Sequence, residues 1–217
     1  SMTSFADALQ ITRGVTAIIG GGGKTSLLYR LADELRTRGS VIVATSTHIW
    51  PPAHLPFSER AGRVLDVLCV GTPGDSGKLA APAQSFSELA RLADFVLVEA
   101  DGSAGRPLKA HLAHEPVVPE NAGQTIAVVG LSGFGKPICE AAHRPERFAA
   151  LAGAAVTDAA TPEMAARVLK AEALHTRVLL NQADAPGGIE AAKQLIKLLN
   201  CPVITASLQK GEIICSF

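Results

Sequence analysis

The sequence has few aromatic side chains, no excess of either charge and no long apolar run. Aromatic residues make up 4% of its 217 residues, so aliphatic side chains must fill the core. Lys and Arg number 20 and Asp and Glu number 20, which gives a formal net charge of +0. Binding to nucleic acid or to an anionic membrane surface needs a positive field that this chain lacks. Its apolar runs are only about six residues long, too short to span a bilayer. We expect neither nucleic acid nor membrane as a partner.

Paired cysteines are also missing. The four cysteines, Cys69, Cys139, Cys201 and Cys215, are scattered and form no Cys-x-x-Cys pair. Such spacing argues against a disulfide framework and against a cysteine-rich metal site. No signal peptide is visible at the N-terminus. The sequence therefore predicts buried thiols and a cytoplasmic location.

What the sequence does contain is an alternation of short apolar runs with amphipathic segments. Hydrophobic residues make up 47%, enough for a sizeable core. Runs rich in Val and Ile suit strands buried on both faces of a parallel sheet. We expect one α/β domain over residues 1–217, a doubly wound, mostly parallel sheet in a P-loop NTPase-like three-layer sandwich. Predicted strands cover 15–19, 41–44, 64–70, 95–98, 125–129, 178–180 and 203–205; predicted helices run from 27 to 39, 161 to 173 and 188 to 199; residues 71–85 are expected to be a surface loop.

A glycine-rich loop joins the first predicted strand to the first predicted helix. It consists of Gly20, Gly21, Gly22, Gly23, Lys24, Thr25 and Ser26. Glycines let backbone N–H groups converge on phosphate oxygens, and the helix N-terminus adds partial positive charge. Lys24 is expected to reach the terminal phosphates and Thr25 to ligate Mg²⁺. Counted from Gly20, the loop is two residues shorter than the full Walker pattern, as in some ligase-type P-loops. A plain glycine turn is the alternative, but the Lys-Thr pair favours a nucleotide phosphate site.

Two other glycine–lysine segments resemble this loop. Residues 130–137 have the full Walker spacing and follow a predicted strand, but Pro137 stands where the Mg²⁺-binding hydroxyl belongs. A substrate-anion loop or a structural turn is expected there. Residues 74–78 lack a following helix, so we expect no site in that segment.

Carboxylates follow the predicted strand at 95–98. Glu99 and Asp101 are two residues apart, so both side chains can point the same way. A carboxylate at the C-terminal edge of such a strand faces the phosphate loop, as in a Walker B motif. We assign Asp101 to Mg²⁺ and Glu99 to water activation or to the metal. Solvated loop acids are the alternative. With Lys24, these two are the expected catalytic residues.

The predicted strand at 178–180 is followed by Asn181-Gln182-Ala183-Asp184. This segment resembles the guanine-specificity motif Asn-Lys-x-Asp, with Gln182 in place of Lys. The Asp184 carboxylate can accept hydrogen bonds from guanine N1–H and its exocyclic amine, and adenine offers no such pair of donors. Asn181 is expected to fasten neighbouring loops, and Ser207 lies where such proteins place a base-contacting loop. The motif favours GTP over ATP, with an ordinary turn as the alternative.

Basic residues follow the acidic strand end. A loop leaving the C-terminal end of a parallel strand lies over the nucleotide crevice. Its cations can bind a phosphate or an anionic substrate. A metal shared by His111 and His114 stays open, because no third ligand is evident. The expected substrate-binding residues are Arg106, Lys109, His111, Lys136 and Arg144.

Taken together, these segments resemble the YqeC-type family, whose members are predicted accessory proteins of selenium-dependent molybdenum hydroxylases. The resemblance implies a P-loop nucleotide-binding protein that acts in cofactor maturation, with the hydroxylase or its cofactor as partner. Residues 99–102 also match a Glu-x-x-Gly motif of metallochaperone GTPases, whose metal-carrying Cys motif and His-rich stretch are absent here. The resemblance to the YqeC-type family rests on residues 20–26, 99–103, 106–111, 114–119, 135–137, 143–146 and 181–184.

Three functions fit this interpretation. The first is a Mg²⁺-dependent nucleoside triphosphatase that uses GTP. The second is an ATP- or GTP-dependent kinase or ligase acting on a small anionic selenium species or a cofactor precursor. The third is a non-catalytic, nucleotide-gated binding module. Hydrolysis accelerated by a partner favours the first, phosphoryl transfer to a small acceptor the second, and binding without turnover the third.

Overall fold

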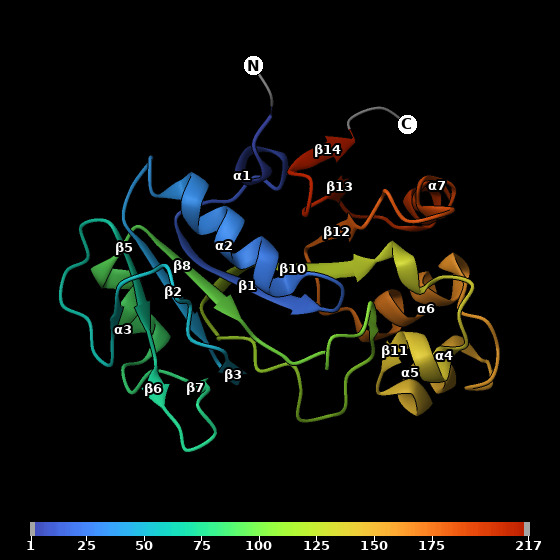
Figure 1. Cartoon of the computed structure of the whole chain (residues 1–217), viewed down its shortest axis with the longest axis horizontal. Coiled ribbons are helices and arrows are strands. Elements are labelled where there is room, and N and C mark those ends of the chain that lie inside the picture. The colour runs from blue at the N-terminus through green and yellow to red at the C-terminus, as the bar shows by residue number, and fades with distance from the viewer. Residues whose placement is uncertain (1–2, 215–217) are drawn as a thin grey trace. The chain divides into compact units, whose positions relative to one another are not determined.

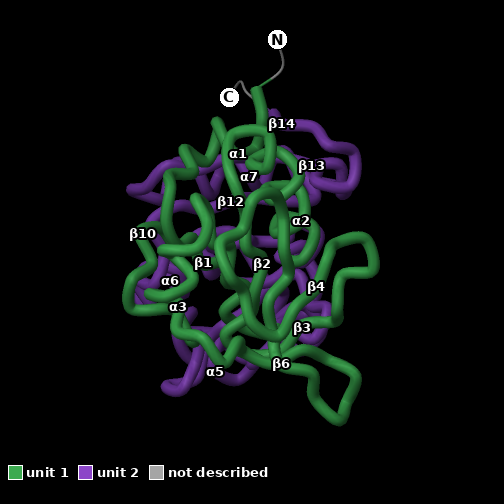
Figure 2. The backbone as a smooth tube through the Cα atoms, turned by 90° about the vertical axis from the view of Figure 1, so that its left-hand side faces the viewer, with its two compact units in different colours: residues 1–19, 25–102, 117–125 green, residues 20–24, 103–116, 126–217 purple. Residues whose placement is uncertain are grey.

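A computed structural model describes residues 3–214 of the chain, and Cys215 lies outside the described residues (Figure 1). The chain divides into two compact units (Figure 2). Unit 1 comprises residues 3–19, 25–102 and 117–125, and unit 2 comprises residues 20–24, 103–116 and 126–214. Nine strands make up the main sheet, which is mostly parallel. The predicted α/β class is therefore confirmed, while the single domain over 1–217 stays a prediction.

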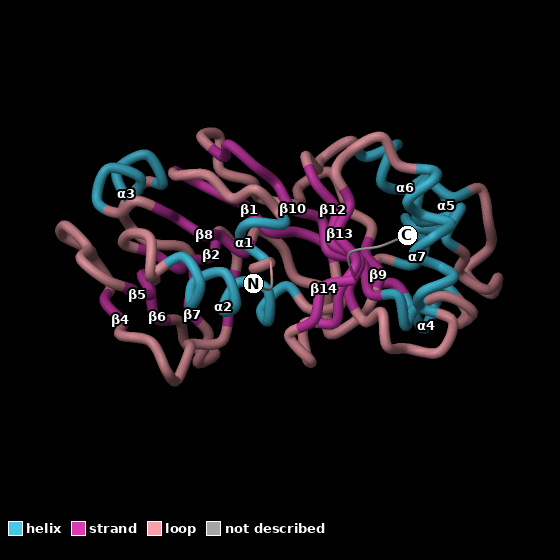
Figure 3. The backbone as a smooth tube through the Cα atoms, turned by 90° about the horizontal axis from the view of Figure 1, so that it is seen from above, coloured by secondary structure: helices cyan, strands magenta, loops and turns pink. Residues whose placement is uncertain are grey.

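Unit 1 holds a run of parallel strands in the order β1-β8-β2-β5-β4. Their bounds are Gly14–Gly20 for β1, Phe95–Glu99 for β8, Val41–Thr45 for β2, Val67–Val70 for β5 and Phe57–Ser58 for β4. Every residue of β2 and β8 is buried, because helices cover both faces of these strands. Helix α2 (Lys24–Leu35) lies on one face and α3 (Phe86–Leu92) on the other, as the views in Figures 1 and 3 agree. The short helix α1 spans Phe5–Ala8.

A second, small sheet in unit 1 corrects the expected loop at 71–85. Strands β6 (Thr72–Pro73) and β7 (Leu79–Ala80) form an antiparallel hairpin, and β7 also pairs with β3 (His48–Ile49). The hairpin turn between β6 and β7 brings Lys78 over the ring of Trp50, with its Nζ atom 5.1 Å from the ring centroid. The lone tryptophan, which follows β3, is 63% exposed, so it is a surface residue beside this hairpin and not part of the core.

Unit 2 contains the parallel strands β10 from Ile126 onwards, β12 and β13, with β14 antiparallel at the edge. A separate parallel pair joins β9 and β11. Helix α6 begins as expected, because the Thr161 side chain accepts a hydrogen bond from the Met164 N–H and Pro162 occupies the first turn. The bounds are Ala122–Gly130 (β10), Arg177–Asn181 (β12), Val203–Ser207 (β13), Glu212–Ile214 (β14), Leu108–Lys109 (β9), Ala142–His143 (β11), Leu131–Gly133 (η1), Ile138–Ala141 (α4), Pro145–Ala152 (α5), Pro162–Glu172 (α6) and Gly188–Leu198 (α7).

All seven predicted strands and all three predicted helices are present. Strand β5 starts at Val67 and not at Val64, and α2 ends at Leu35 before the turn that contains Gly39. The sequence-based prediction missed four short helices, α1, α3, α4 and α5, and the two- and three-residue strands, whose periodicity is too brief to detect. Within the described residues, none of the helices is both long and apolar enough for a membrane span.

Candidate functional site

The glycine loop of unit 2 needs a glycine at each of its four positions. A Cβ atom built on Gly20, Gly21, Gly22 or Gly23 would lie 2.3–2.5 Å from a neighbouring atom. At Gly22 that neighbour is the Cα atom of Gly130, and the backbone φ of Gly22 is +71°, a conformation that side chains other than glycine rarely adopt. The loop is therefore packed against other backbone segments of unit 2 at Gly20, Gly21 and Gly22 and against the Asn181 side chain at Gly23, which explains why the sequence has no larger residue there.

Hydrogen bonds fix the course of this loop. The Gly21 N–H donates to the Val128 carbonyl at 3.0 Å, and the Gly22 N–H donates to the Arg106 carbonyl at 3.0 Å. The Asn181 side-chain amide donates to the Gly22 carbonyl at 2.7 Å, while its oxygen accepts from the Leu208 N–H at 2.9 Å. The Gly21 and Gly22 amides thus have protein acceptors. N–H groups in the first turn of a helix have no acceptor within the helix itself, so the start of α2 can donate to an anion.

In unit 1 the second residue of α2 faces the end of β8. The Thr25 hydroxyl lies 3.4 Å from both carboxylate oxygens of Glu99. Glu99 is 6% exposed, and its carbonyl accepts a hydrogen bond from the Thr45 hydroxyl at 2.8 Å, which fixes the strand end. Asp101 is also buried, at 1% exposure. A hydroxyl and a carboxylate are the hard oxygen ligands that Mg²⁺ takes, so Thr25 and Glu99 fit the ion.

A phenol lies on the same helix. Burial raises the pKa of Tyr29 to about 12, with smaller contributions from Cys69 and from Glu99. Its ring meets that of His54 edge to face, with the centroids 5.0 Å apart. Tyr29 therefore stays protonated at neutral pH, and its ring packs against His54.

The predicted base-recognition residues all belong to unit 2. Asn181 is 6% exposed and ties the glycine loop to Leu208, so its predicted fastening role agrees with the geometry. Gln182 adopts a φ of +65° and accepts a hydrogen bond from the Ser132 hydroxyl at 2.6 Å. Asp184 is exposed. Ser207 is 3% exposed, and within residues 3–214 its hydroxyl has no hydrogen-bond partner.

Two of the expected substrate-binding cations share one internal carboxylate partner, Glu115. Lys109 Nζ lies 3.2 Å from a Glu115 carboxylate oxygen and 3.1 Å from His143 Nδ1, and its side chain is 0% exposed. Arg144 Nε donates to the other Glu115 oxygen at 3.0 Å. Burial opposes ionisation of Glu115, but hydrogen bonds from Arg144, from the Leu112 N–H and from Lys109 outweigh it and lower the pKa of Glu115 to about 2. Glu115 is thus the centre of a partly buried charge cluster that sequence reasoning missed.

Two more of the expected residues, Arg106 and His111, are also held by the protein. Arg106 donates from its guanidinium to the carbonyls of Cys139 at 2.8 Å and Glu140 at 2.5 Å. His111 Nδ1 lies 3.0 Å from a carboxylate oxygen of Glu172, whose other oxygen accepts from the His111 N–H at 2.7 Å. Glu172 is 61 residues away in the sequence, and no local signal indicates it.

Lys136 is exposed and belongs to a turn, which is one of the two structures expected for residues 130–137. The Gly135 N–H donates to the Ala160 carbonyl at 2.9 Å, and the Ala160 N–H donates to the Lys136 carbonyl at 2.8 Å. The second glycine–lysine segment is therefore braced against residues 158–160. Among the described residues there is no group of three or more His, Cys, Asp or Glu side chains that could hold a metal ion, and this covers His111 and His114.

Two comparisons with known proteins both point to the YqeC family. The family described as YqeC protein matches residues 16–146. A curated relative, the "Uncharacterized protein YqeC" of Escherichia coli (strain K12), is 35% identical over 161 residues. That match covers 64% of this chain and 60% of the relative, so the chain spans about three fifths of the relative's length.

Proposed function

The chain belongs to the YqeC family, and from this premise we propose that it is a Mg²⁺-dependent nucleotide-binding protein that prefers GTP and acts in the maturation of a selenium-dependent molybdenum hydroxylase. The observation that carries nucleotide binding is the glycine loop. Four consecutive glycines without room for a Cβ lead directly into Lys24 and Thr25 at the start of α2. Such a strand–loop–helix junction is the element that cradles nucleotide phosphates in P-loop proteins.

The proposed roles follow the contacts on either side of this junction. Amides from Gly23 to Ser26 bind phosphate oxygens, and the Lys24 ammonium neutralises the terminal phosphates. Thr25 and Glu99 would hold Mg²⁺, which when bound neutralises charge on the phosphates. Asp101 is then left to orient the attacking water. Glu99 thus takes the metal, one of the two roles expected for it, and Asp101 takes the water in place of the metal, because the Thr25 hydroxyl faces Glu99.

Recognition of the base is assigned to the other predicted motif. Asn181 holds the loop, and the exposed Asp184 carboxylate is available to the two N–H donors of guanine. The buried Ser207 hydroxyl offers a further hydrogen bond to a ligand, since it has none within residues 3–214. No observation favours an acceptor site for a kinase or ligase, because Lys109 and Arg144 are paired with Glu115.

Isothermal titration calorimetry with GTP and with ATP, each with Mg²⁺, tests the nucleotide site. The Lys24→Ala variant should lose measurable binding while its circular dichroism spectrum and melting temperature stay unchanged. Lys136→Ala is the matched control, because this lysine stands in the other glycine–lysine segment and is exposed in a turn. Equal affinity of Lys24→Ala and wild type would remove the proposed site. A preference for ATP would leave the phosphate site standing and remove the role of Asp184.

The proposed role in maturation of the hydroxylase is tested separately. In a host that makes a selenium-dependent molybdenum hydroxylase, deletion of the gene for this protein should lower the selenium content and activity of the purified hydroxylase. Wild-type protein should restore both, and Lys24→Ala should not. An unchanged selenium content after deletion would refute the role in maturation without touching nucleotide binding.

A further inference from the structure

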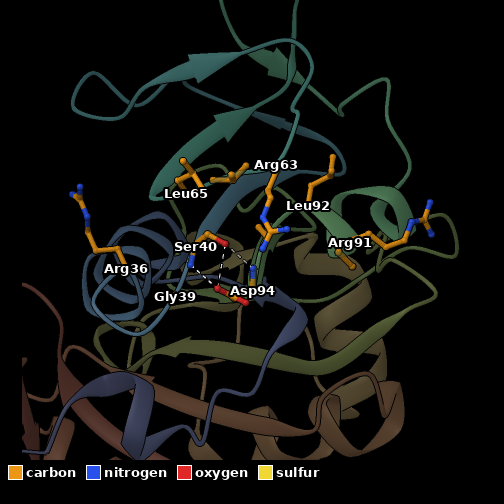
Figure 4. A pocket seen from close by; sticks show the side chains of 11 residues that line it. Arg36, Gly39, Ser40, Arg63, Leu65, Arg91, Leu92 and Asp94 are labelled. Atoms are coloured by element: carbon orange, nitrogen blue, oxygen red, sulfur yellow. Dashed lines mark hydrogen bonds between the residues drawn. The ribbon is translucent and has the colours of Figure 1, made fainter.

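A cavity of about 440 Å³ opens in unit 1 at the edge where strands β2, β5 and β8 begin (Figure 4). It lies between the end of α2, residues 63–65 before β5, and the end of α3 with Ala93 and Asp94. This edge is opposite the end of β8 that carries Glu99, since β8 runs from Phe95 to Glu99. The cavity is therefore a separate feature from the Thr25–Glu99 pair.

Hydrogen bonds between Ser40 and Asp94 hold together one wall of the cavity. The Asp94 carboxylate accepts hydrogen bonds from the Ser40 N–H at 2.9 Å and from the Ser40 hydroxyl at 3.3 Å, and the Asp94 N–H donates back to that hydroxyl at 2.9 Å. These bonds are drawn at the centre of Figure 4. The Ser40 N–H and Arg13 lower the pKa of Asp94, so the carboxylate is ionised and already paired.

The rim carries positive charge that the protein does not neutralise. Arg36 forms a two-point ion pair with Asp66, at 3.1 Å from Nε and 2.5 Å from Nη2. Arg63 and Arg91, in contrast, have no ion pair or hydrogen bond from their side chains to any residue in the range 3–214. With Asp66 and Asp94 each matched by an arginine, two guanidinium groups remain to meet a ligand.

The arrangement of the rim residues suits an extended peptide segment better than a small molecule. In Figure 4 the side chain of Arg63 lies near Ser40 and Asp94, while those of Arg36 and Arg91 extend away on opposite sides, so the cations do not converge on one point. Leu65 lines the same cavity and is 87% exposed, more than any other large hydrophobic residue that the structure describes. Arginine is enriched in protein interfaces, so an arginine-rich rim of this kind fits a protein partner.

We propose that this cavity and its rim are a docking surface for an acidic, partly apolar segment of a partner protein. Carboxylates of the segment pair with Arg63 and Arg91, and an apolar side chain of the segment covers Leu65. Arginine binds carboxylates with two parallel hydrogen bonds, which gives such docking a defined geometry. Because the surface lies at the start of β8, a docked segment leaves the opposite edge with Glu99 uncovered.

The probe for this surface is a fluorescein-labelled peptide of alternating Glu and Leu, with binding followed by fluorescence anisotropy. The wild-type protein should bind it, with an affinity that falls as salt rises. The Arg63→Glu/Arg91→Glu double variant should bind about tenfold or more weakly, as reversal of two interface charges predicts. Leu65→Gln should also weaken binding, and free glutamate should not compete at equal concentration. A peptide of alternating Lys and Leu should not bind.

Arg60→Glu is the matched control, because Arg60 is exposed in the same unit but does not line the cavity. An equal loss in Arg60→Glu would show unspecific attraction and overturn the proposal, as would absence of binding to wild type or unchanged binding in the double variant. Competition by free glutamate would assign the arginines to a small anion instead, which also overturns the docking surface. Circular dichroism of each variant confirms that the change is not a loss of folding.

Discussion

Replacement of Glu115 by glutamine should destabilise the protein in a pH-dependent way. In the folded chain the pKa of Glu115 lies at about 2, against an ordinary value of 4.5. A difference of about 2.5 in pKa corresponds to about 3 kcal/mol of stabilisation of the folded state at neutral pH. The neutral amide of the variant cannot supply this energy, and it leaves the fully buried Lys109 ammonium without its carboxylate. Breaking such a pair costs about 3–5 kcal/mol, which agrees with the value from the pKa.

The pH dependence has a definite sign. Because the folded-state pKa of Glu115 is depressed, its contribution is fully present above about pH 4.5 and is lost as the pH falls towards about 2. The gap in unfolding free energy between wild type and Glu115→Gln should therefore be about 3 kcal/mol at pH 7 and about half of that at pH 3. Both stabilities come from urea unfolding followed by far-ultraviolet circular dichroism, with unchanged slopes for the two proteins.

Glu120→Gln is the control, since this carboxylate is exposed and is five residues further along the chain. It should change the unfolding free energy by less than about 0.5 kcal/mol at either pH. The reasoning is refuted if Glu115→Gln matches wild type within that margin at pH 7. It is refuted equally if the gap stays constant between pH 7 and pH 3, because the stabilisation would then not come from the ionised carboxylate.

Three further predictions concern the loop and the thiols. Gly22→Ala should lower the unfolding free energy, measured by urea unfolding, by about 2 kcal/mol more than Gly105→Ala does. Both glycines have a positive φ, but only at Gly22 would the added Cβ meet backbone, at 2.5 Å. Equal losses in the two variants would show that the loop can shift to accommodate the Cβ. Asn181→Ala should lower the unfolding free energy by about 2–3 kcal/mol, because two hydrogen bonds of a buried amide disappear. A change under about 1 kcal/mol in the same assay would contradict the role of Asn181 in holding the glycine loop. Iodoacetamide at pH 8 should label the exposed Cys139 and leave Cys69 unlabelled, because burial raises the pKa of the Cys69 thiol to about 11. Peptide mass mapping checks which cysteine is labelled, and early labelling of Cys69 would show that the structure around it opens.

Much of the fold was accessible from the sequence because its signals are local. Strands β2 and β8 are continuous apolar runs, the pattern of strands buried on both faces. The start of helix α6 is evident from Thr161 and Pro162, since both the cap and the first turn depend on neighbouring residues alone. The short strands β6 and β7 were missed because two residues show no periodicity, and their pairing with each other defines them.

For the candidate site, too, the sequence supplied the local features and the tertiary structure supplied the contacts between them. The sequence alone determined that a glycine loop, carboxylates at a strand end and an Asn-x-x-Asp segment exist in that order, because residue type and spacing carry this chemistry. Only the tertiary structure decided which carboxylate faces Thr25, and it selected Glu99. It also decided that Lys109 and Arg144 pair with Glu115, and that His111 meets Glu172 across 61 residues. A side chain's partner depends on chain segments that meet through folding, so spacing along the sequence can name the charges but not pair them.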